Sequence, residues 1–284
     1  MTSPKYAASE ETGRYYRFPD TPPLISVTSV IGVFSKPALV PWASKLAGER
    51  AVHHELEWHA IGDEYRESQW QKFAKKKCNE DRDPTEAQLR KWSMDGDEAA
   101  RKWISAASKE YMTQRQVLGS AVHYACETDF DMSDPRMVAF VEQVGDEKAI
   151  RNMYQQYRQF LSDNDVKIVA QEMTVASLTH GYAGTLDLII ETNGRRLLAD
   201  IKTGTGVYAT TALQLAAYRY AEYQASDEGS LYSYDPQVDG AIVIHLKPMS
   251  HKIVEFRCDE EVFEVFLKAK DLKTWDDSSK EMFV

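Results

Sequence analysis

The sequence has few cysteines and no long apolar run, and each shortage excludes a class of protein. Its three cysteines, Cys78, Cys126 and Cys258, lie far apart in 284 residues, which fits neither a disulfide framework nor the spacing of a zinc site. No apolar stretch approaches the roughly 20 residues that cross a bilayer, and no charged-then-apolar signal segment is present. We therefore expect a cytoplasmic protein with reduced thiols and no membrane partner.

Positive charge is also scarce. The chain has 34 Lys and Arg residues against 44 Asp and Glu residues, a formal net charge of −10. This balance argues against a protein that only coats nucleic acid, because phosphate binding needs clustered cations. It does not argue against an enzyme that holds a metal with carboxylates and lines a single groove with basic residues.

The order of expected elements predicts a layered α/β or α+β domain. Residues 1–23 are polar and contain four prolines, which indicates an irregular arm. Residues 24–34 fit a short strand, or a helix capped by Ser26 or Thr28. Helices are then expected at about 41–115 (several, with a break at 81–84), 119–129, 137–161 (interrupted near Gly145), 210–224 and 260–273. Strands are expected at 168–176, 184–191, 196–202, 240–246 and 252–257.

Asn193-Gly194, between two apolar runs, is the strongest local signal. Both residues tolerate the positive φ that a two-residue hairpin turn requires. A turn of this kind fixes the register of the two strands, so that Ile190 pairs with Leu197 and Asp187 pairs with Asp200.

Two carboxylates opposite each other in a sheet repel, with Cβ atoms about 4.5–5.5 Å apart. A divalent cation bound by both would offset this repulsion, and oxygen ligands favour Mg²⁺ or Mn²⁺. Lys202 projects from the same face as Asp200 and adds an ammonium to the group. The alternative is that Asp187 and Asp200 are solvated edge residues whose charge Lys202 merely offsets.

Four motifs in order resemble the RecB-like branch of the PD-(D/E)XK nuclease superfamily, and the phage-type exonucleases in particular. Three of them surround or follow the hairpin: Gln171-Glu172 before it, Gly184-x-x-Asp187 with Asp200-x-Lys202-Thr203-Gly204 on it, and Gln214-x-x-x-Tyr218 after it. The fourth is the earlier Gly119-x-x-x-His123-x-x-x-Glu127. Ser26-Val-Thr-Ser-Val-Ile and Lys36-Pro37…Trp42 are similar to the lead-in of the phage enzymes. Leu186 replaces the proline of the superfamily name.

The resemblance implies a restriction-endonuclease-like core at 116–284, with a central mixed β-sheet flanked by helices. Residues 24–115 would form a mostly helical region that shapes a DNA channel, after an arm at 1–23. His123 would join Asp187 and Asp200 as metal ligands, and Asp187, Asp200, Lys202 and Glu172 would be the catalytic set. Substrate-binding or supporting roles would fall to Gln214, Tyr218, Glu127 and Thr203.

The activity implied is a Mg²⁺- or Mn²⁺-dependent exonuclease on linear single- or double-stranded DNA, in phage or bacterial recombination or repair. A recombination or single-strand-annealing protein would be a further partner. A structure-specific or restriction-type endonuclease is the alternative enzyme, and an inactive DNA- or partner-binding protein is the alternative of another class. Three cysteines are too few for the four-cysteine iron–sulfur cluster of some relatives, and no nucleotide-binding Gly-x-x-x-x-Gly-Lys signature occurs.

One segment is both basic and aromatic. It runs from Arg66 through Trp70, Lys72 and Phe73 to Lys75, Lys76 and Lys77. Its lysines are candidates for contact with a DNA backbone and its aromatics for stacking on bases. A solvated helix face is the commoner explanation of such a run.

Overall fold

The computed structural model describes residues 6–10, 13–34, 39–76 and 83–279. Contacts divide the chain into two compact units. Residues 36–114 form a helical unit, and residues 1–35 with 115–284 form a unit built on a β-sheet. Cys78 and Lys77 lie outside the described residues. No described helix combines the length and the apolar character that a membrane span requires.

A mixed sheet of ten strands organises the second unit. Its strands are β1 (Ala7–Glu10), β2 (Gly13–Tyr16), β3 (Leu24–Ser26), β4 (Lys167–Ser177), β5 (Tyr182–Thr192), β6 (Arg195–Lys202), β7 (Tyr223–Ala225), β8 (Leu231–Ser233), β9 (Gly240–Lys247) and β10 (Ser250–Phe256). The order β1-β2-β3-β5-β4-β7-β8 is joined by β6, which pairs with both β5 and β9, and β9 pairs with β10. The pairs β3–β5 and β6–β9 are parallel, and the others are antiparallel.

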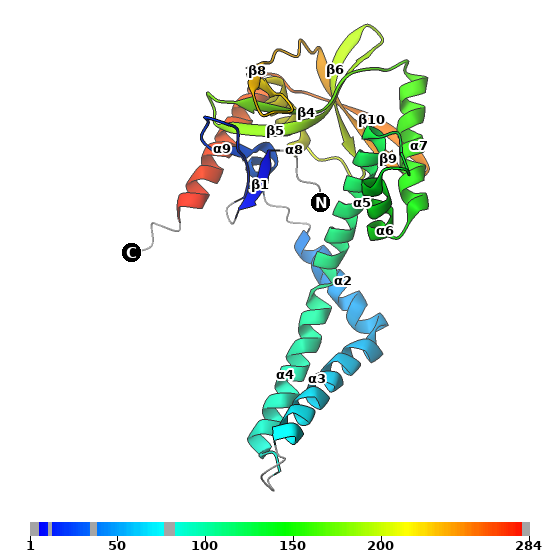
Figure 1. The fold of residues 1–284 in the computed structure, drawn as a ribbon, viewed down its shortest axis with the longest axis vertical. Coiled ribbons are helices and arrows are strands. Elements are labelled where there is room, and N and C mark those ends of the chain that lie inside the picture. Colours follow the sequence, from blue (N-terminus) through cyan, green and yellow to red (C-terminus); the bar gives the residue numbers. More distant parts are fainter. Residues whose placement is uncertain (1–5, 11–12, 35–38, 77–82, 280–284) are drawn as a thin grey trace. The chain divides into compact units, whose positions relative to one another are not determined.

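Helices cover both faces of this sheet (Figure 1). One face packs on α1 (Val27–Ile31), α8 (Thr210–Arg219) and α9 (Glu260–Ser279). The other packs on α6 (Pro135–Val144), α7 (Glu147–Asp163) and the C-terminal part of α5 (Ala107–Glu127). Neighbouring residues of β9 divide between the two cores, Val243 to the first and Ile244 to the second, as strand alternation requires. The prediction of a mixed sheet flanked by helices is confirmed.

The β5–β6 hairpin has the predicted turn, and its register is as predicted from Thr192 and Arg195 to Leu188 and Ala199, but the predicted pair of Asp187 with Asp200 is not formed. Asn193 and Gly194 have φ of 50° and 72°, and Ile190 pairs with Leu197. The paired ladder ends at Leu188 and Ala199, one position before Asp187 and Asp200. The two aspartates therefore lie where the strands stop pairing, which leaves their carboxylates available to other partners.

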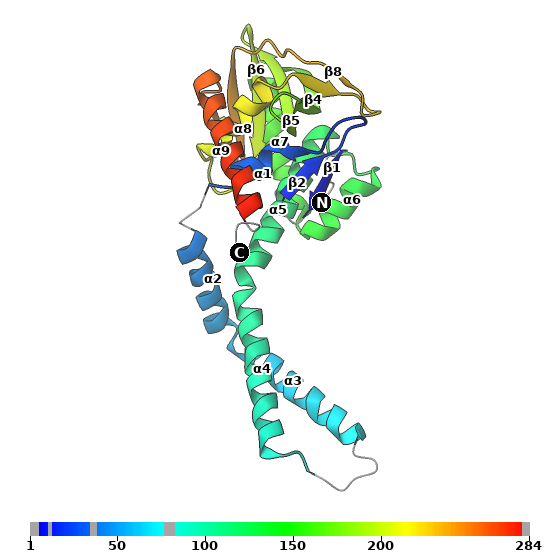
Figure 2. The ribbon, with the colours of Figure 1, turned by 90° about the vertical axis from the view of Figure 1, so that its left-hand side faces the viewer.

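The helical unit consists of α2 (Leu39–His53), α3 (Glu55–Lys76), α4 (Glu86–Ser105) and the start of α5. Helices α3 and α4 contact each other and lie side by side in Figure 1, while Figure 2 shows them diverging towards the C-terminal end of α3. A Cβ atom on Gly96 would lie 2.8 Å from the carbonyl oxygen of Gly62. Glycine at this position is therefore what lets the two backbones approach.

Two expectations about the elements were wrong. The segment expected as an irregular arm contains strands β1 and β2, because Tyr16 and Phe18 bury their rings in a small core of the sheet unit. The helix expected at 210–224 ends at Arg219, and residues 223–225 form β7 instead. Pairing of β7 with β4 and β8 outweighs the local helical pattern there.

Candidate active site

Three side chains from three elements converge on one point of the sheet unit. His123 comes from α5, Glu172 from β4 and Asp187 from β5, and one ligand atom of each lies within 4.8 Å of the others. The Nδ1 atom of His123 is 3.6 Å from Oδ2 of Asp187. One imidazole nitrogen and two carboxylates form a donor set suited to a divalent cation.

A backbone hydrogen bond orients the His123 ring. Its Nε2 atom lies 2.9 Å from the carbonyl oxygen of Ile201, at the end of β6. A carbonyl only accepts, so neutral His123 carries its proton on Nε2 and donates it there. The lone pair of Nδ1 is then left on the side of Asp187, which is the usual arrangement of a metal-binding histidine.

Glu172 was expected in the catalytic set but not among the metal ligands. Its neighbours Gln171 and Met173 pair with Leu188 and Leu186, so Glu172 lies opposite Asp187. Its φ of 49° is unusual for a residue other than glycine, and such backbone strain costs of order 1–3 kcal/mol. The carboxyl group of Glu172 forms no hydrogen bond or ion pair with any described residue.

Burial raises the pKa of Glu172 to about 9, and the charges of Asp187 and Glu127 add to the effect. A bound cation would reverse this shift, because it stabilises the ionised form that burial disfavours. The strain and the missing cationic partner together fit a metal ligand better than a structural residue.

Asp187 also holds the end of β6. Its Oδ2 atom accepts a hydrogen bond of 2.7 Å from the backbone N–H of Ile201. The backbone of Ile201 therefore contacts His123 through its carbonyl and Asp187 through its amide, and fixes both side chains. The hairpin register places Asp187 at this position without a direct pairing to Asp200.

Asp200 is engaged by Lys202. The Lys202 ammonium lies 2.9 Å from Oδ1 and 2.8 Å from Oδ2 of Asp200, which is 2% exposed. Burial raises the pKa of Asp200 to about 6, although Lys202 opposes the rise. Burial lowers the pKa of Lys202, but the charges of Asp200 and Asp187 outweigh it, so that this pKa stands above its usual value. The ammonium is therefore charged and held in place.

Gln214 and Tyr218 extend this pair into α8. The Lys202 ammonium is 3.4 Å from Oε1 of Gln214, whose Nε2 donates to the Tyr218 hydroxyl at 3.2 Å. A Cβ atom on Gly184 would lie 2.6 Å from Cε1 of Tyr218. The glycine of the hairpin motif thus makes room for the tyrosine of the helix motif, which explains why both belong to one pattern.

Thr203 and Glu127 also lie at the site. A Cβ atom on Gly119 would lie 3.3 Å from Oγ1 of Thr203, so the glycine of the α5 motif allows the helix to approach the end of β6. Glu127 is an exposed residue that lines the same cavity, and partial loss of solvent around its carboxyl group raises the pKa of that group.

A cavity of about 330 Å³ is lined by most of these side chains, namely those of His123, Glu127, Glu172, Asp187, Lys202, Gln214 and Tyr218. Its walls include residues that sequence interpretation missed as site residues: Arg14, Tyr16, Ser26, Thr28, Gln116, Ser120, Tyr124 and Thr185. The Tyr16 hydroxyl lies 3.1 Å from Oγ1 of Thr185. The N-terminal segment reaches the site only because β3 pairs in parallel with β5, and no local sequence signal indicates such a long-range pairing.

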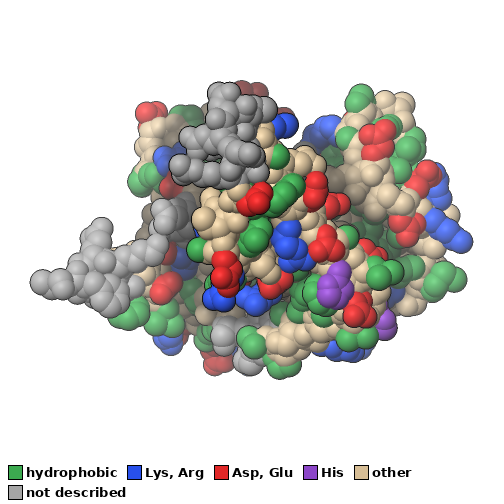
Figure 3. All heavy atoms as spheres, turned by 90° about the horizontal axis from the view of Figure 1, so that it is seen from below, with side chains coloured by type: hydrophobic (Ala, Val, Ile, Leu, Met, Phe, Trp, Pro, Cys, Tyr) green, Lys and Arg blue, Asp and Glu red, His purple; other side chains and the backbone are tan. Residues whose placement is uncertain are grey.

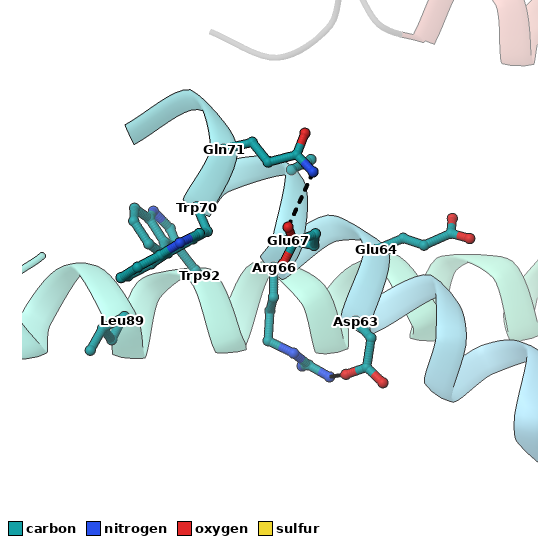
Figure 4. Close-up of a pocket in the computed structure, with 9 residues that line it drawn as sticks. Asp63, Glu64, Arg66, Glu67, Trp70, Gln71, Leu89 and Trp92 are labelled. Atoms are coloured by element: carbon teal, nitrogen blue, oxygen red, sulfur yellow. Dashed lines mark hydrogen bonds and ion pairs between the residues drawn. The ribbon is translucent and has the colours of Figure 1, made fainter. Parts of the chain in front are cut away.

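The basic and aromatic segment lies on α3 of the helical unit and forms part of a different surface. A cavity of about 800 Å³ there is lined by Asp63, Glu64, Arg66, Glu67, Ser68, Trp70, Gln71, Leu89 and Trp92 (Figure 4). The charge of Arg66 is offset by Asp63 and Asp97. The side chains of Lys72 and Lys75 are exposed, and that of Lys76 lies outside the described residues. On the face in Figure 3, basic side chains alternate with acidic ones among the described residues. DNA contact by this segment stays a prediction.

No family model matches the chain, and no curated protein matches it. Among solved structures, one described as "Crystal structure of SSO0001" is similar over 57% of this chain and 73% of that chain. The sequence identity is 15% and the TM-score is 0.28. A TM-score of this size does not establish a common fold, so this similarity carries no argument here.

Proposed function

We propose that the protein is a divalent-metal-dependent DNA nuclease with a core of the RecB-like PD-(D/E)XK type. One observation carries the proposal: His123, Glu172 and Asp187 converge in a single cavity that is also lined by Lys202, whose ammonium pairs with the buried Asp200. This arrangement supplies ligands for a hard cation next to a fixed ammonium. Phosphodiester hydrolysis needs both, because negative charge increases on the phosphate oxygens in the transition state.

His123, Glu172 and Asp187 would hold a Mg²⁺ or Mn²⁺ ion, with Asp200 as a further candidate ligand. The bound ion would supply a Lewis acid and lower the pKa of a coordinated water. Lys202 would donate hydrogen bonds to a phosphate oxygen or orient the attacking water. Asp200 and Gln214 keep its ammonium within reach, so that no large side-chain rearrangement precedes the reaction.

The reaction we favour is exonucleolytic, in phage or bacterial recombination or repair, as the resemblance of the motifs implies. A structure-specific or restriction-type endonuclease is the second candidate. Incubation of linear and closed circular forms of one DNA with Mg²⁺ or Mn²⁺ separates the two. We expect degradation of the linear form alone, and cleavage of the circular form would replace our choice by the endonuclease.

Substitution of the site residues tests the proposal itself. We expect Asp187→Asn and Lys202→Ala each to lower the cleavage rate by about 100-fold or more, since each removes a group that stabilises the transition state. Lys247→Ala is a matched control, because Lys247 contacts the nearby Gly204 carbonyl but does not line the cavity. Full activity in Lys202→Ala would remove the proposed mechanism. A wild-type protein that leaves every DNA form uncut would instead favour an inactive binding protein.

A further inference from the structure

Arg14 lines the cavity, and among the described residues its charge has no partner. It lies on β2 and lines the same cavity as His123, Asp187 and Lys202. Tyr16, two residues further along β2, lines the same cavity, and the charge of Arg14 opposes the rise in the pKa of Tyr16 that burial causes. Among the residues that the structure describes, Arg14 forms no ion pair, although carboxylates line the same cavity.

The backbone holds Arg14 in place from both sides. Its N–H donates a 2.8 Å hydrogen bond to Oγ of Ser29, and β2 lies between β1 and β3 in the sheet. The backbone of Arg14 is therefore fixed at the cavity, and its guanidinium forms no ion pair with any described residue. A half-buried charge without a partner loses hydration, so an arginine with only a structural role is more stable when it is paired or fully solvated.

The charges around the cavity indicate the role of the Arg14 guanidinium. Lys202 is already neutralised by Asp200. With one divalent cation bound, the ion offsets two of the three other carboxylates, those of Glu127, Glu172 and Asp187. Arg14 offsets the third. Without Arg14 the loaded cavity would keep an excess negative charge, which would repel an anionic substrate.

Hydroxyl groups complete the wall on this side. Ser26 and Thr28 line the cavity, and their side-chain oxygens lie 2.7 Å apart. Hydroxyl, phenol and guanidinium groups are all hydrogen-bond donors to phosphate oxygens, and guanidinium matches two of those oxygens at once.

We propose that Arg14 binds a backbone phosphate of the DNA, beside the phosphate that is cleaved. Substrate binding then depends on metal loading as well, because the ion and Arg14 together offset the carboxylates that would repel the phosphate. The inference rests on the proposed function, and it assigns to the N-terminal β-hairpin a direct part in holding the substrate. Arg14 is a substrate-binding residue in this account, with no part in proton transfer.

The test is DNA binding by the full chain, measured by fluorescence anisotropy of a short labelled duplex in calcium chloride and in EDTA. We expect Arg14→Gln to raise the Kd in calcium by about 10- to 100-fold, as loss of a charge-assisted hydrogen bond implies. The slope of log Kd against log salt should fall by about one. Arg14→Lys should give an intermediate Kd, because it keeps the charge and loses the paired donors.

Arg17→Gln is the matched control. Arg17 follows the same strand and carries the same charge, but it pairs with Glu10 and does not line the cavity. We expect its Kd to stay within about twofold of wild type. Calcium affinity, measured by calorimetry, should be equal or higher in Arg14→Gln, because a cation near the ion is removed. Weaker calcium binding would mean a structural role and would overturn the proposal.

The remaining outcomes are also decisive. If wild type binds and cuts DNA while Arg14→Gln behaves like Arg17→Gln, the assignment of Arg14 is wrong and the proposed nuclease stands. If wild type neither binds nor cuts DNA with any divalent metal, the proposed function fails, and the assignment of Arg14 fails with it.

Discussion

A partly buried carboxylate without a cationic partner destabilises a folded protein, and among the described residues of the metal-free chain Glu172 is in this position. Burial, Asp187 and Glu127 raise its pKa to about 9, against an ordinary value near 4.5. In the folded protein the group therefore keeps its proton at neutral pH, while in the unfolded chain it has lost it.

This difference predicts how stability depends on pH. The contribution of protonated Glu172 is fully present below about pH 4.5 and is lost as the pH rises towards about 9. We expect the free energy of unfolding of the wild type in EDTA to fall by about 2–3 kcal/mol from pH 6 to pH 8, because one proton difference between the folded and the unfolded state contributes about 1.4 kcal/mol per pH unit. Glu172→Gln should show a smaller fall, because glutamine stays neutral throughout.

Chemical denaturation at the two pH values, in EDTA, measures the effect. Glu142→Gln is the control, since Glu142 is exposed on α6. Added Mn²⁺ should stabilise the wild type more than Glu172→Gln, because a ligand is lost in the variant. If the free energy of unfolding depends on pH in the same way in wild type, Glu172→Gln and the control, the pKa of Glu172 is not raised in the folded protein.

The chemistry of single residues was only partly predictable from the sequence. The hairpin turn gave the positions of Asp187, Asp200 and Lys202, because Asn193-Gly194 sets a register by local rules alone. The preference of Glu172 over Asp200 as a partner of His123 was not predictable. It depends on the positive φ of Glu172 in β4 and on the ion pair between Lys202 and Asp200, and neither follows from spacing along one strand.

At the scale of elements, the packing of α8 on β5 positions the ammonium. Tyr218 fills the space above Gly184 and supports Gln214, which in turn contacts Lys202. Gly184→Ala would put a methyl group 2.6 Å from the Tyr218 ring. The ring is fully buried, so it has little room to move.

We expect Gly184→Ala to lower the free energy of unfolding by about 1–3 kcal/mol, as overpacking of a core does. The cleavage rate should fall as well, because α8 must shift and takes Gln214 with it. Gly204→Ala is the control for an added methyl group near the site, since its Cβ atom would meet nothing closer than 3.8 Å. Urea denaturation and the cleavage assay together measure both effects. Equal stability of the two variants would mean that Tyr218 does not pack on Gly184.

Elements formed by local patterns were predictable, and those formed by distant pairing were not. The break between α6 and α7 falls at Gly145, whose φ of 69° ends the first helix as the sequence indicated. The N-terminal strands escaped prediction because β3 pairs with β5, more than 150 residues later. The same pairing places Arg14 at the site, so the sequence alone could not indicate that this residue, which we infer to bind DNA, belongs to the site.

At the scale of the whole molecule, the two units differ in how much they bury. In the sheet unit, large side chains such as Leu188, Ile190 and Phe266 are fully buried. In the described part of residues 36–114, the buried apolar residues are Ala100 and Ala107, while Val52, Leu56 and Met94 are at least 70% exposed. The helical unit therefore gains much less from burial of apolar surface.

Local stability should follow this difference. We expect amide hydrogens of α3 to exchange with solvent about 100-fold faster than those of α7, because opening α3 exposes little apolar surface. The comparison is between two helices, so secondary structure is matched. Helix α7 buries Ile150, Met153, Tyr157 and Phe160, whereas α3 has its ring contacts among Trp70, Phe73 and Trp92. Hydrogen exchange followed by mass spectrometry measures both helices in one experiment. Equal protection of the two helices would show that the exposed apolar residues of the helical unit are covered in solution. A second copy of the chain would then be the first candidate for the covering partner. In that case the protection of α3 would increase with protein concentration.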